Sequence, residues 1–183
     1  ARAEPLMATE VLNVIDLGRM AYVPALEFQR ETHAQVLAKL TPPTLIFVEH
    51  DPVITVSQRQ EAPSHLLATL DALTKLGIDV QPTDRGGDVT YHGSGQLVAY
   101  PILHLERRGL SITGYLRLLE QAVIDALAQF GLHGERLPGY TGVWVNGAKV
   151  AAIGIGVYHG VSFHGTAINV NPNMAHWDLI VPC

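Results

Sequence analysis

The sequence contains only one cysteine, Cys183, among its 183 residues. A single cysteine cannot form a disulfide within the chain, and it cannot supply a metal site that needs several cysteines. Long apolar runs are also lacking, because none reaches the roughly 18 residues that suggest a membrane-spanning helix. The first residues, ARAEPLMATE, lack the basic and then apolar pattern of a signal peptide. These absences predict a cytoplasmic protein that does not enter the membrane.

Positive charge is scarce as well. Twelve Lys and Arg residues stand against 17 Asp and Glu, which gives a formal net charge of −5. General nucleic-acid binding needs a basic face, so this composition argues against it. Hydrophobic residues make up 48% of the chain, and no long Pro, Gly or Ser linker divides it. We therefore expect residues 1–183 to form a single domain with a buried core.

Hydrophobic spacing predicts both helices and strands in the first 110 residues. Apolar residues at helical spacing predict helices at 22–40 and 64–76, the second closed by Gly77 in the left-handed conformation. Runs rich in β-branched residues, parted by turn residues, predict strands at 11–18, 44–49, 53–56, 89–91 and 97–103.

The second half begins with the clearest helix of the sequence. Apolar residues keep helical spacing over 112–130, and either Ser111 or Thr113 can cap the start. Asn146-Gly147 then gives a strong hairpin signal and His159-Gly160 a weaker one, which together predict three antiparallel strands. Such hairpins do not suit an all-parallel sheet. The predicted fold class is therefore α+β, with a mixed or antiparallel sheet and flanking helices.

The stretch DRGGDVTYHGSGQLVAYPI, residues 84–102, concentrates glycine around polar side chains. Glycine permits positive φ and lets a ligand approach the backbone amides closely. The same residues also suit a pair of turns flanking a short strand, and spacing alone does not separate the two interpretations. The stretch matches neither GxGxxG nor GxxxxGK[ST], and a strand follows it rather than a helix, so a nucleotide loop is not indicated.

Two further residues carry possible chemistry. Lys149 lies in the apolar run AKVAAIGIG, where burial would lower the pKa of its amine and make it a base. Alternatively, it is an edge-strand lysine whose amine reaches water. Cys183 would be a strong nucleophile only beside a cation or a base, a part that Lys149 could play. Its alternative is a cysteine without any chemical role.

Metal binding is not expected. The chain has nine histidines but neither an HExxH motif nor a cysteine pattern. His164 is expected to order a pocket beside Gly165. Trp144 and Trp177 are expected to be packing residues.

Four motifs occur together in one order: RGGDVTYHGSGQLVAYPI, KVAAIGIG, SFHGTAINVN and IVPC. In this order and spacing they closely resemble the lipoyl(octanoyl) transferases. The resemblance extends from the EHDPVIT segment at Glu49 to Cys183. It implies the mixed-sheet fold that this family shares with lipoate and biotin protein ligases. Members of the family continue beyond the cysteine, so the resemblance also implies that a C-terminal tail is absent from residues 1–183.

The resemblance implies a set of site residues. Cys183 matches the acyl-accepting nucleophile, and Lys149 matches its partner lysine. Three segments match the substrate-binding residues of the family. They are Arg85, Gly86, Gly87, Asp88, Val89, Thr90, Tyr91 and His92 in the first, Ala152, Ile153 and Gly154 in the second, and Gly165, Thr166 and Ala167 in the third.

The implied reaction moves an octanoyl group from octanoyl-acyl carrier protein to a lipoyl-domain lysine, through a thioester on the cysteine. The acceptors would be lipoyl domains of 2-oxoacid dehydrogenase complexes and the glycine cleavage H protein. No cofactor is implied. Because the partners are acidic, a basic docking patch of Arg85, Arg107, Arg108 and Arg117 is a further hypothesis. Two alternatives stay open: an ATP-dependent lipoate or biotin protein ligase, and a non-catalytic protein that binds acyl carriers or lipoyl domains.

Overall fold

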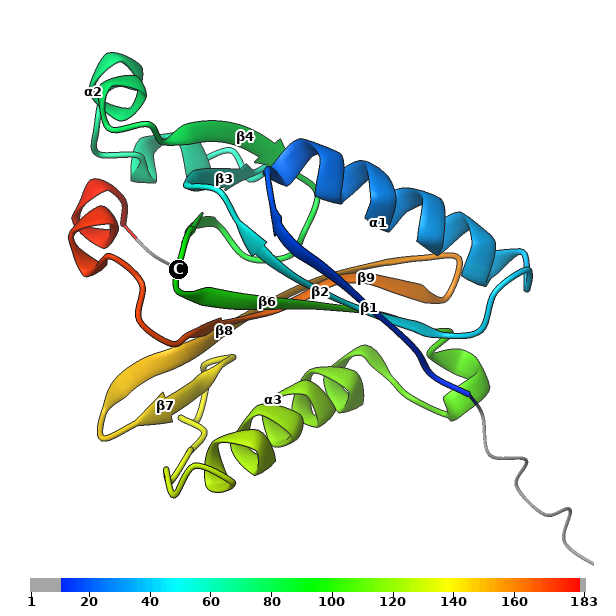
Figure 1. Cartoon of the computed structure of the whole chain (residues 1–183). Coiled ribbons are helices and arrows are strands. Elements are labelled where there is room, and N and C mark those ends of the chain that lie inside the picture. Colours follow the sequence, from blue (N-terminus) through cyan, green and yellow to red (C-terminus); the bar gives the residue numbers. More distant parts are fainter. Residues whose placement is uncertain (1–10, 182–183) are drawn as a thin grey trace, which may run out of the picture.

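A computed structural model describes residues 11–181 and shows two sheets with helices packed around them (Figure 1). The larger sheet has the strand order β1-β2-β6-β9-β8-β7, and the smaller has the order β4-β3-β5. The strands are β1 (Asn13–Met20), β2 (Thr44–His50), β3 (Val53–Ser57), β4 (Asp79–Thr83), β5 (Val89–His92), β6 (Gln96–Ile102), β7 (Val143–Val145), β8 (Ala148–Tyr158) and β9 (Val161–Asn169).

Three α-helices and three short 3₁₀ helices lie between or after these strands in the described residues. They are α1 (Tyr22–Leu37), α2 (Leu70–Lys75), α3 (Ile112–Ala128), η1 (Ala62–His65), η2 (Glu106–Arg108) and η3 (Met174–Leu179). Helix α1 covers one face of the larger sheet and α3 covers part of the other (Figure 1). The β1–β2 and β3–β4 pairs are parallel and the other strand pairs are antiparallel. The predicted α+β class with a mixed sheet is confirmed.

Helix α1 combines an apolar contact with a polar one. Its Ala25 and Val36 are buried in a cluster with Ile46, from β2, and other apolar side chains of the sheet. Two of its buried polar residues bond to β9 instead: Gln29 accepts from the backbone N–H of His164, and the His33 ring bonds to the strand's backbone as well. These bonds satisfy polar groups that would otherwise be buried unpaired. They fix α1 above the strand that carries the third predicted substrate-binding segment.

The predicted helix at 112–130 and the two hairpins are confirmed. The Ser111 hydroxyl accepts from the backbone N–H of Gly114 at 3.1 Å, so Ser111 rather than Thr113 is the N-cap. The Asn146-Gly147 turn has φ values of 51° and 79°, and His159-Gly160 has values of 47° and 75°. Two successive positive φ angles are what a type I′ hairpin turn requires.

The single helix expected at 64–76 is wrong. The chain instead forms η1, leaves helical geometry at 66–69, and begins α2 after Thr69, whose hydroxyl caps the helix. Leu67 and Ala68 donate their backbone N–H groups to the Leu179 carbonyl, so this segment pairs with the C-terminal chain rather than with its own helix. Long-range pairing has overridden local helix propensity here.

Strand β4 has no counterpart among the predicted strands. It contains Pro82, which cannot donate a backbone hydrogen bond, and it lies at the edge of the small sheet, where that loss is tolerated. Strands β2 and β3, predicted at 44–49 and 53–56, follow each other in the chain but belong to different sheets.

Candidate active site

A cavity of about 780 Å³ lies between the two sheets and is lined by all three predicted substrate-binding segments. Its floor is the β8–β9 pair, where Ala152 faces Ala167 and Gly154 faces Gly165. These residues carry a methyl group or nothing, so they leave room above the sheet. The neighbouring strand β6 adds Val98, which is paired with Ala167. A floor of small apolar residues is suited to an extended apolar ligand.

The glycine-rich loop forms a second wall of this cavity by crossing from the small sheet to β8. The N–H of Gly86 donates to the Ile155 carbonyl at 2.8 Å. A Cβ on Gly154 would lie only 2.7 Å from the Gly86 carbonyl oxygen, so the two backbones can meet only where β8 has a glycine. Gly87 has a φ of 99°, which favours glycine as well. The loop is therefore both a turn and part of the cavity lining.

Arg85 holds the shape of this loop. Its guanidinium donates to the hydroxyl and carbonyl oxygens of Thr55, at 3.0 and 3.2 Å, and to the carbonyl oxygens of Gly86 and Asp88, both at 3.0 Å. Arginine can satisfy this many acceptors from one planar group. A fixed positive charge thus lies in the cavity wall.

His164, which lines the cavity, is hydrogen-bonded to Asp84. The His164 Nε2 donates to Asp84 Oδ1 at 2.8 Å, and His164 adopts a positive φ of 55°. The pKa of Asp84 is lowered to about 2, and this hydrogen bond is the main cause. Burial lowers the pKa of His164. His164 lines the cavity beside Gly165, as the sequence predicts.

The buried His92 lines the same cavity. Burial, followed by the neighbouring His50, lowers the pKa of His92 to about 3. The His92 Nδ1 donates to Gln96 Oε1 at 2.6 Å, and the Gln96 amide donates in turn to Asn169 Oδ1 at 2.9 Å. His50 Nε2 bonds to the Tyr100 hydroxyl at 2.8 Å. This bond occupies the polar end of Tyr100, whose side chain also lines the cavity.

Lys149 reaches the cavity because of an irregularity in β8. Val143 pairs with Ala151 and Trp144 pairs with Lys149, so Val150 is an extra residue in the register. Val150 and Ala151 both pack toward α3, whereas regular alternation would place Lys149 on the face of Ala151. The β-bulge places Lys149 on the opposite face of the sheet, where its side chain lines the cavity.

The structure decides between the two environments expected for Lys149. The side chain is exposed rather than buried, in agreement with the alternative in which its amine reaches water. It is not on an edge strand, however, because β7 lies outside β8 in the sheet. Its ammonium lies 5.2 Å from the centre of the Trp144 ring, within the range of a cation–π contact. Trp144 is buried, as expected for packing, but it also supports this cation.

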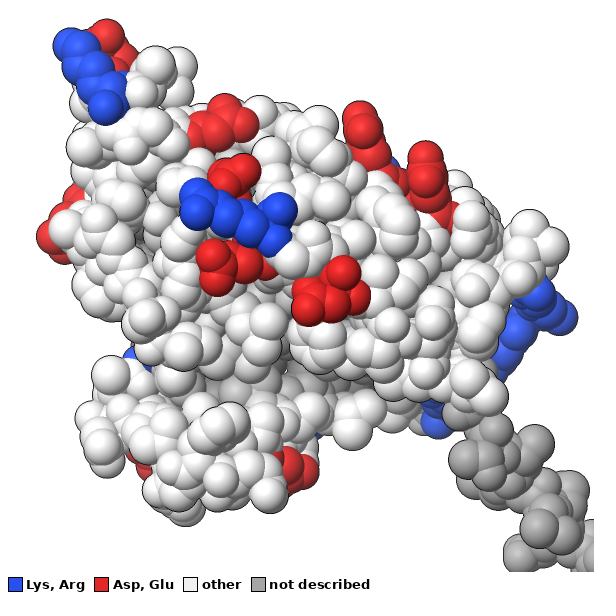
Figure 2. Space-filling model, in the orientation of Figure 1, with Lys and Arg blue, Asp and Glu red and all other residues white. Residues whose placement is uncertain are grey.

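The lining of the cavity is positively charged although the chain is acidic. Arg59, Arg85 and Lys149 line it, and no Asp or Glu between residues 11 and 181 does so. Figure 2 shows acidic and basic side chains scattered over the mostly uncharged surface of one face of the molecule. The docking patch of Arg85, Arg107, Arg108 and Arg117 stays a prediction: Arg85 lines the cavity, and Arg117 pairs with the buried Glu120 at 2.7 Å while its own side chain is 50% exposed.

Two predicted substrate-binding residues face away from the cavity. The Asp88 carboxylate bonds to His65, and the Tyr91 hydroxyl bonds to His176. Cys183 lies outside the described residues. The other predicted site residues line the cavity: Arg85, Gly86, Gly87, Val89, Thr90, His92, Lys149, Ala152, Ile153, Gly154, Gly165, Thr166 and Ala167.

Sequence reasoning missed several lining residues. Tyr22 comes from the start of α1, and Val98 and Tyr100 come from β6. Alternation along the predicted strand 97–103 would have placed Val98 and Tyr100 on one face. No comparable signal in the sequence pointed to Tyr22 or Arg59.

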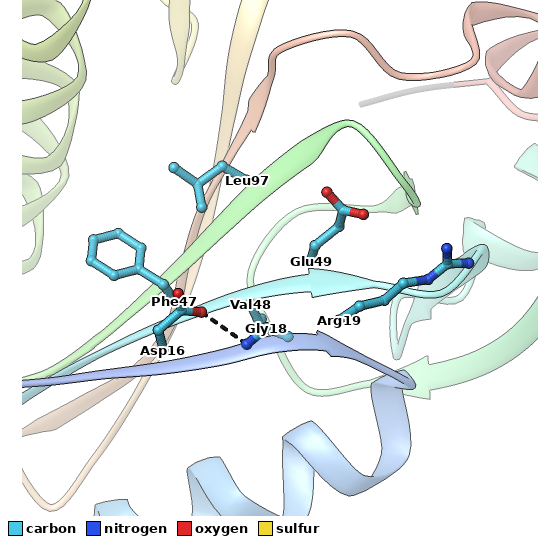
Figure 3. A pocket seen from close by; sticks show the side chains of 7 residues that line it. All are labelled: Asp16, Gly18, Arg19, Phe47, Val48, Glu49 and Leu97. Atoms are coloured by element: carbon cyan, nitrogen blue, oxygen red, sulfur yellow. Dashed lines mark hydrogen bonds between the residues drawn. The ribbon is translucent and has the colours of Figure 1, made fainter.

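A second hollow, of about 500 Å³, lies over β1, β2 and β6 (Figure 3). Phe47 and Leu97 contribute apolar surface, and Asp16, Arg19 and Glu49 contribute charge. Of these residues only Leu97 falls within one of the four motifs, and none of them lines the larger cavity. Within 11–181, no three His, Asp or Glu side chains are grouped so that they could hold a metal ion. None of the helices described there is long and apolar enough to span a membrane.

Residues 21–183 match the family model of the lipoyl protein ligase A/B catalytic domain. The chain belongs to this family. An octanoyltransferase from Chloroflexus aurantiacus is 47% identical over 175 residues, which cover 94% of this chain and 78% of the relative. One from Solibacter usitatus is 44% identical over 167 residues, which cover 91% and 76%. The structure of a lipoate-protein ligase A bound with ATP superposes with a TM-score of 0.75 at 18% identity, covering 93% of this chain and 71% of that one.

Membership of the lipoyl protein ligase A/B family confirms the resemblance and the fold predicted from the motifs. The names of the relatives indicate an acyltransferase enzyme. The non-catalytic alternative is therefore not supported. The similarity to the ATP-bound ligase concerns the fold alone.

Proposed function

We propose that this protein transfers an octanoyl group during protein lipoylation, with residues 1–183 forming one catalytic domain. One observation carries the proposal: the floor of small residues and the lysine of the β-bulge line one cavity. Relatives named octanoyltransferase, at up to 47% identity, support the octanoyl group as the cargo. An octanoyl chain lying over Ala152 and Ala167 would place its carbonyl carbon toward one end of the β8–β9 strand pair.

The donor in this proposal is octanoyl-acyl carrier protein. The Cys183 thiolate attacks the thioester carbonyl, the carrier's thiolate leaves, and the octanoyl group becomes a thioester of Cys183. The Lys149 ammonium gives its proton to the departing thiolate. One thioester replaces another, so the step needs no external energy source.

The acceptor is a lysine of a lipoyl domain, in a 2-oxoacid dehydrogenase complex or in the glycine cleavage H protein. Its amine attacks the octanoyl-Cys183 carbonyl, an amide forms, and the Cys183 thiolate leaves. Lys149, now neutral, takes the proton that the amine loses. Acid–base help of this kind is typically worth about 10²- to 10⁴-fold in rate. The cycle returns Lys149 to its charged form.

The test uses purified protein and octanoyl-acyl carrier protein without ATP, followed by intact-mass spectrometry. We expect one octanoyl adduct on the wild type and none on Cys183→Ala. Adding a lipoyl domain should discharge the adduct and acylate that domain. Absence of an adduct on folded wild-type protein, with octanoylation that depends on ATP and free octanoate, would favour the ligase alternative instead.

A further inference from the structure

The chain that leads to Cys183 is paired with the segment after η1. Leu67 donates its backbone N–H to the Leu179 carbonyl at 2.9 Å, and Val181 donates to the His65 carbonyl at 2.8 Å. Leu66 and Ile180 form a β-bridge between these bonds. The path of the backbone is therefore fixed up to two residues before Cys183.

The side chain of His65 makes a separate contact with the glycine-rich loop. Its Nδ1 donates to Asp88 Oδ2 at 2.7 Å, and the two side chains are 32% and 13% exposed. The backbone carbonyl of Asp88 also accepts from the Arg85 guanidinium at 3.0 Å, and Arg85 lines the cavity. His65 thus holds the C-terminal chain with its backbone and the cavity loop with its ring.

The position of the Asp88 carboxylate depends on this histidine. Among the described residues, its Oδ1 is buried and has no hydrogen-bond partner, and its Oδ2 bonds to His65. A buried carboxylate that loses its main partner is costly to keep in place. Removing the His65 ring would therefore displace the carboxylate and the loop that carries it.

We infer that His65 is a positioning residue, which holds the chain bearing Cys183 in register with the loop that shapes the acyl cavity. The inference rests on the proposed role of Cys183 as nucleophile. Such alignment matters because a misplacement of about 1 Å can cost about 100-fold in rate. His65 would not touch the reacting atoms itself.

The test measures single-turnover formation of octanoyl-Cys183 by quenched-flow mass spectrometry. His65→Leu removes the donor but keeps the backbone carbonyl that binds Val181. We expect the rate at saturating donor to fall about tenfold or more, while the donor concentration at half-maximal rate changes less than about twofold. His65→Asn should recover most of the rate, because its amide nitrogen can donate from nearly the same place as Nδ1. His133→Leu, at an exposed histidine, is the matched control.

Two results would overturn the inference: a normal rate in His65→Leu, or equal losses in His65→Leu and His65→Asn. Should His65→Leu fail to fold, Asp88→Ala tests the same contact from the other side and should slow the reaction similarly. In the double variant the two losses should not add.

Alkylation of Cys183 by iodoacetamide separates this inference from the proposed function, because it needs no acyl donor. If the wild type forms no adduct, the proposed transfer fails. The contact can still be judged by whether His65→Leu changes the alkylation rate and its pH profile while His65→Asn restores both. Unchanged alkylation would then reject the positioning role.

Discussion

The carbonyl oxygen of Gly86 lies 2.7 Å from the place where residue 154 would carry a Cβ. Glycine at 154 is thus what allows the cavity loop to rest on β8. We predict that Gly154→Ala pushes the loop away, destabilises the protein by about 1–3 kcal/mol and lowers octanoyl transfer at least tenfold. Urea unfolding and a transfer assay measure the two effects.

Gly77→Ala is the control for Gly154→Ala. Its φ of 69° makes alanine unfavourable, but no atom lies within 4 Å of the added Cβ. It should cost about 1 kcal/mol without affecting transfer. Equal losses of transfer in both variants would mean that stability, rather than the loop, explains the effect.

The small floor of the cavity should set its capacity. Ala152→Leu places a larger side chain over the β8–β9 pair, where Ala152 faces Ala167. We expect octanoyl transfer to fall about 100-fold while the midpoint of thermal unfolding changes little, since the new side chain enters empty space. Ala126→Leu, on the exposed side of α3, provides the comparison. Full activity of Ala152→Leu would show that the acyl chain does not lie over this floor.

Lys149 should govern the rate of both half-reactions. We expect Lys149→Ala to slow transfer by about 10²- to 10⁴-fold at neutral pH, because both the thiolate's neighbouring cation and the base are lost. Lys75→Ala removes an exposed lysine that pairs with Asp71 and should have no effect. Near-wild-type transfer by Lys149→Ala would refute the role given to this residue.

Charge at the cavity should affect binding of an acidic carrier. Arg59 lines the cavity together with Arg85 and Lys149. We predict that Arg59→Glu raises the KM for octanoyl-acyl carrier protein about tenfold at low salt, leaves kcat nearly unchanged, and differs less from the wild type at high salt. The control Lys39→Glu changes the same charge at the end of α1. A salt-independent defect would contradict an electrostatic cause.

The buried histidines should make stability depend on pH. The pKa of His92 is lowered to about 3, so between roughly pH 6.5 and pH 3 the unfolded chain binds a proton that the folded protein does not. Stability therefore falls as the pH falls through this range, by about 1.4 kcal/mol per pH unit for this histidine. His92→Gln cannot titrate, so urea unfolding between pH 6 and pH 4 should show a shallower slope. Parallel slopes would mean that His92 is protonated in the folded protein.

Sequence reasoning could find most of the larger sheet because its signals are local. The Asn146-Gly147 and His159-Gly160 turns place two positive φ angles at hairpin positions, and Ser111 caps its own helix. The helix expected at 64–76 failed because residues 66–68 pair with chain more than 100 positions away. Strand β4 was missed because it contains Pro82. Sequence patterns for strands exclude proline, but an edge strand tolerates it.

The site was only partly predictable from the sequence. The motifs identified Arg85, Lys149 and the glycines as candidate site residues. The face of the sheet on which Lys149 lies, however, depends on the extra residue Val150. Asp88 was also a candidate site residue, although its carboxylate faces His65 and not the cavity. Bulges and side-chain directions depend on the partner strand, which a linear pattern does not contain.

The cavity has a consequence for how the two sheets hold together. Val98 and Ala167 belong to the apolar cluster under α1, whereas Val89 belongs to the cluster of the small sheet, and all three line the cavity. An octanoyl chain between them would touch both clusters and join them into one continuous core. The octanoyl group would then be part of the protein's apolar core until it is transferred. The acylated form should consequently exchange its backbone amide hydrogens more slowly than the free enzyme, in both sheets at once.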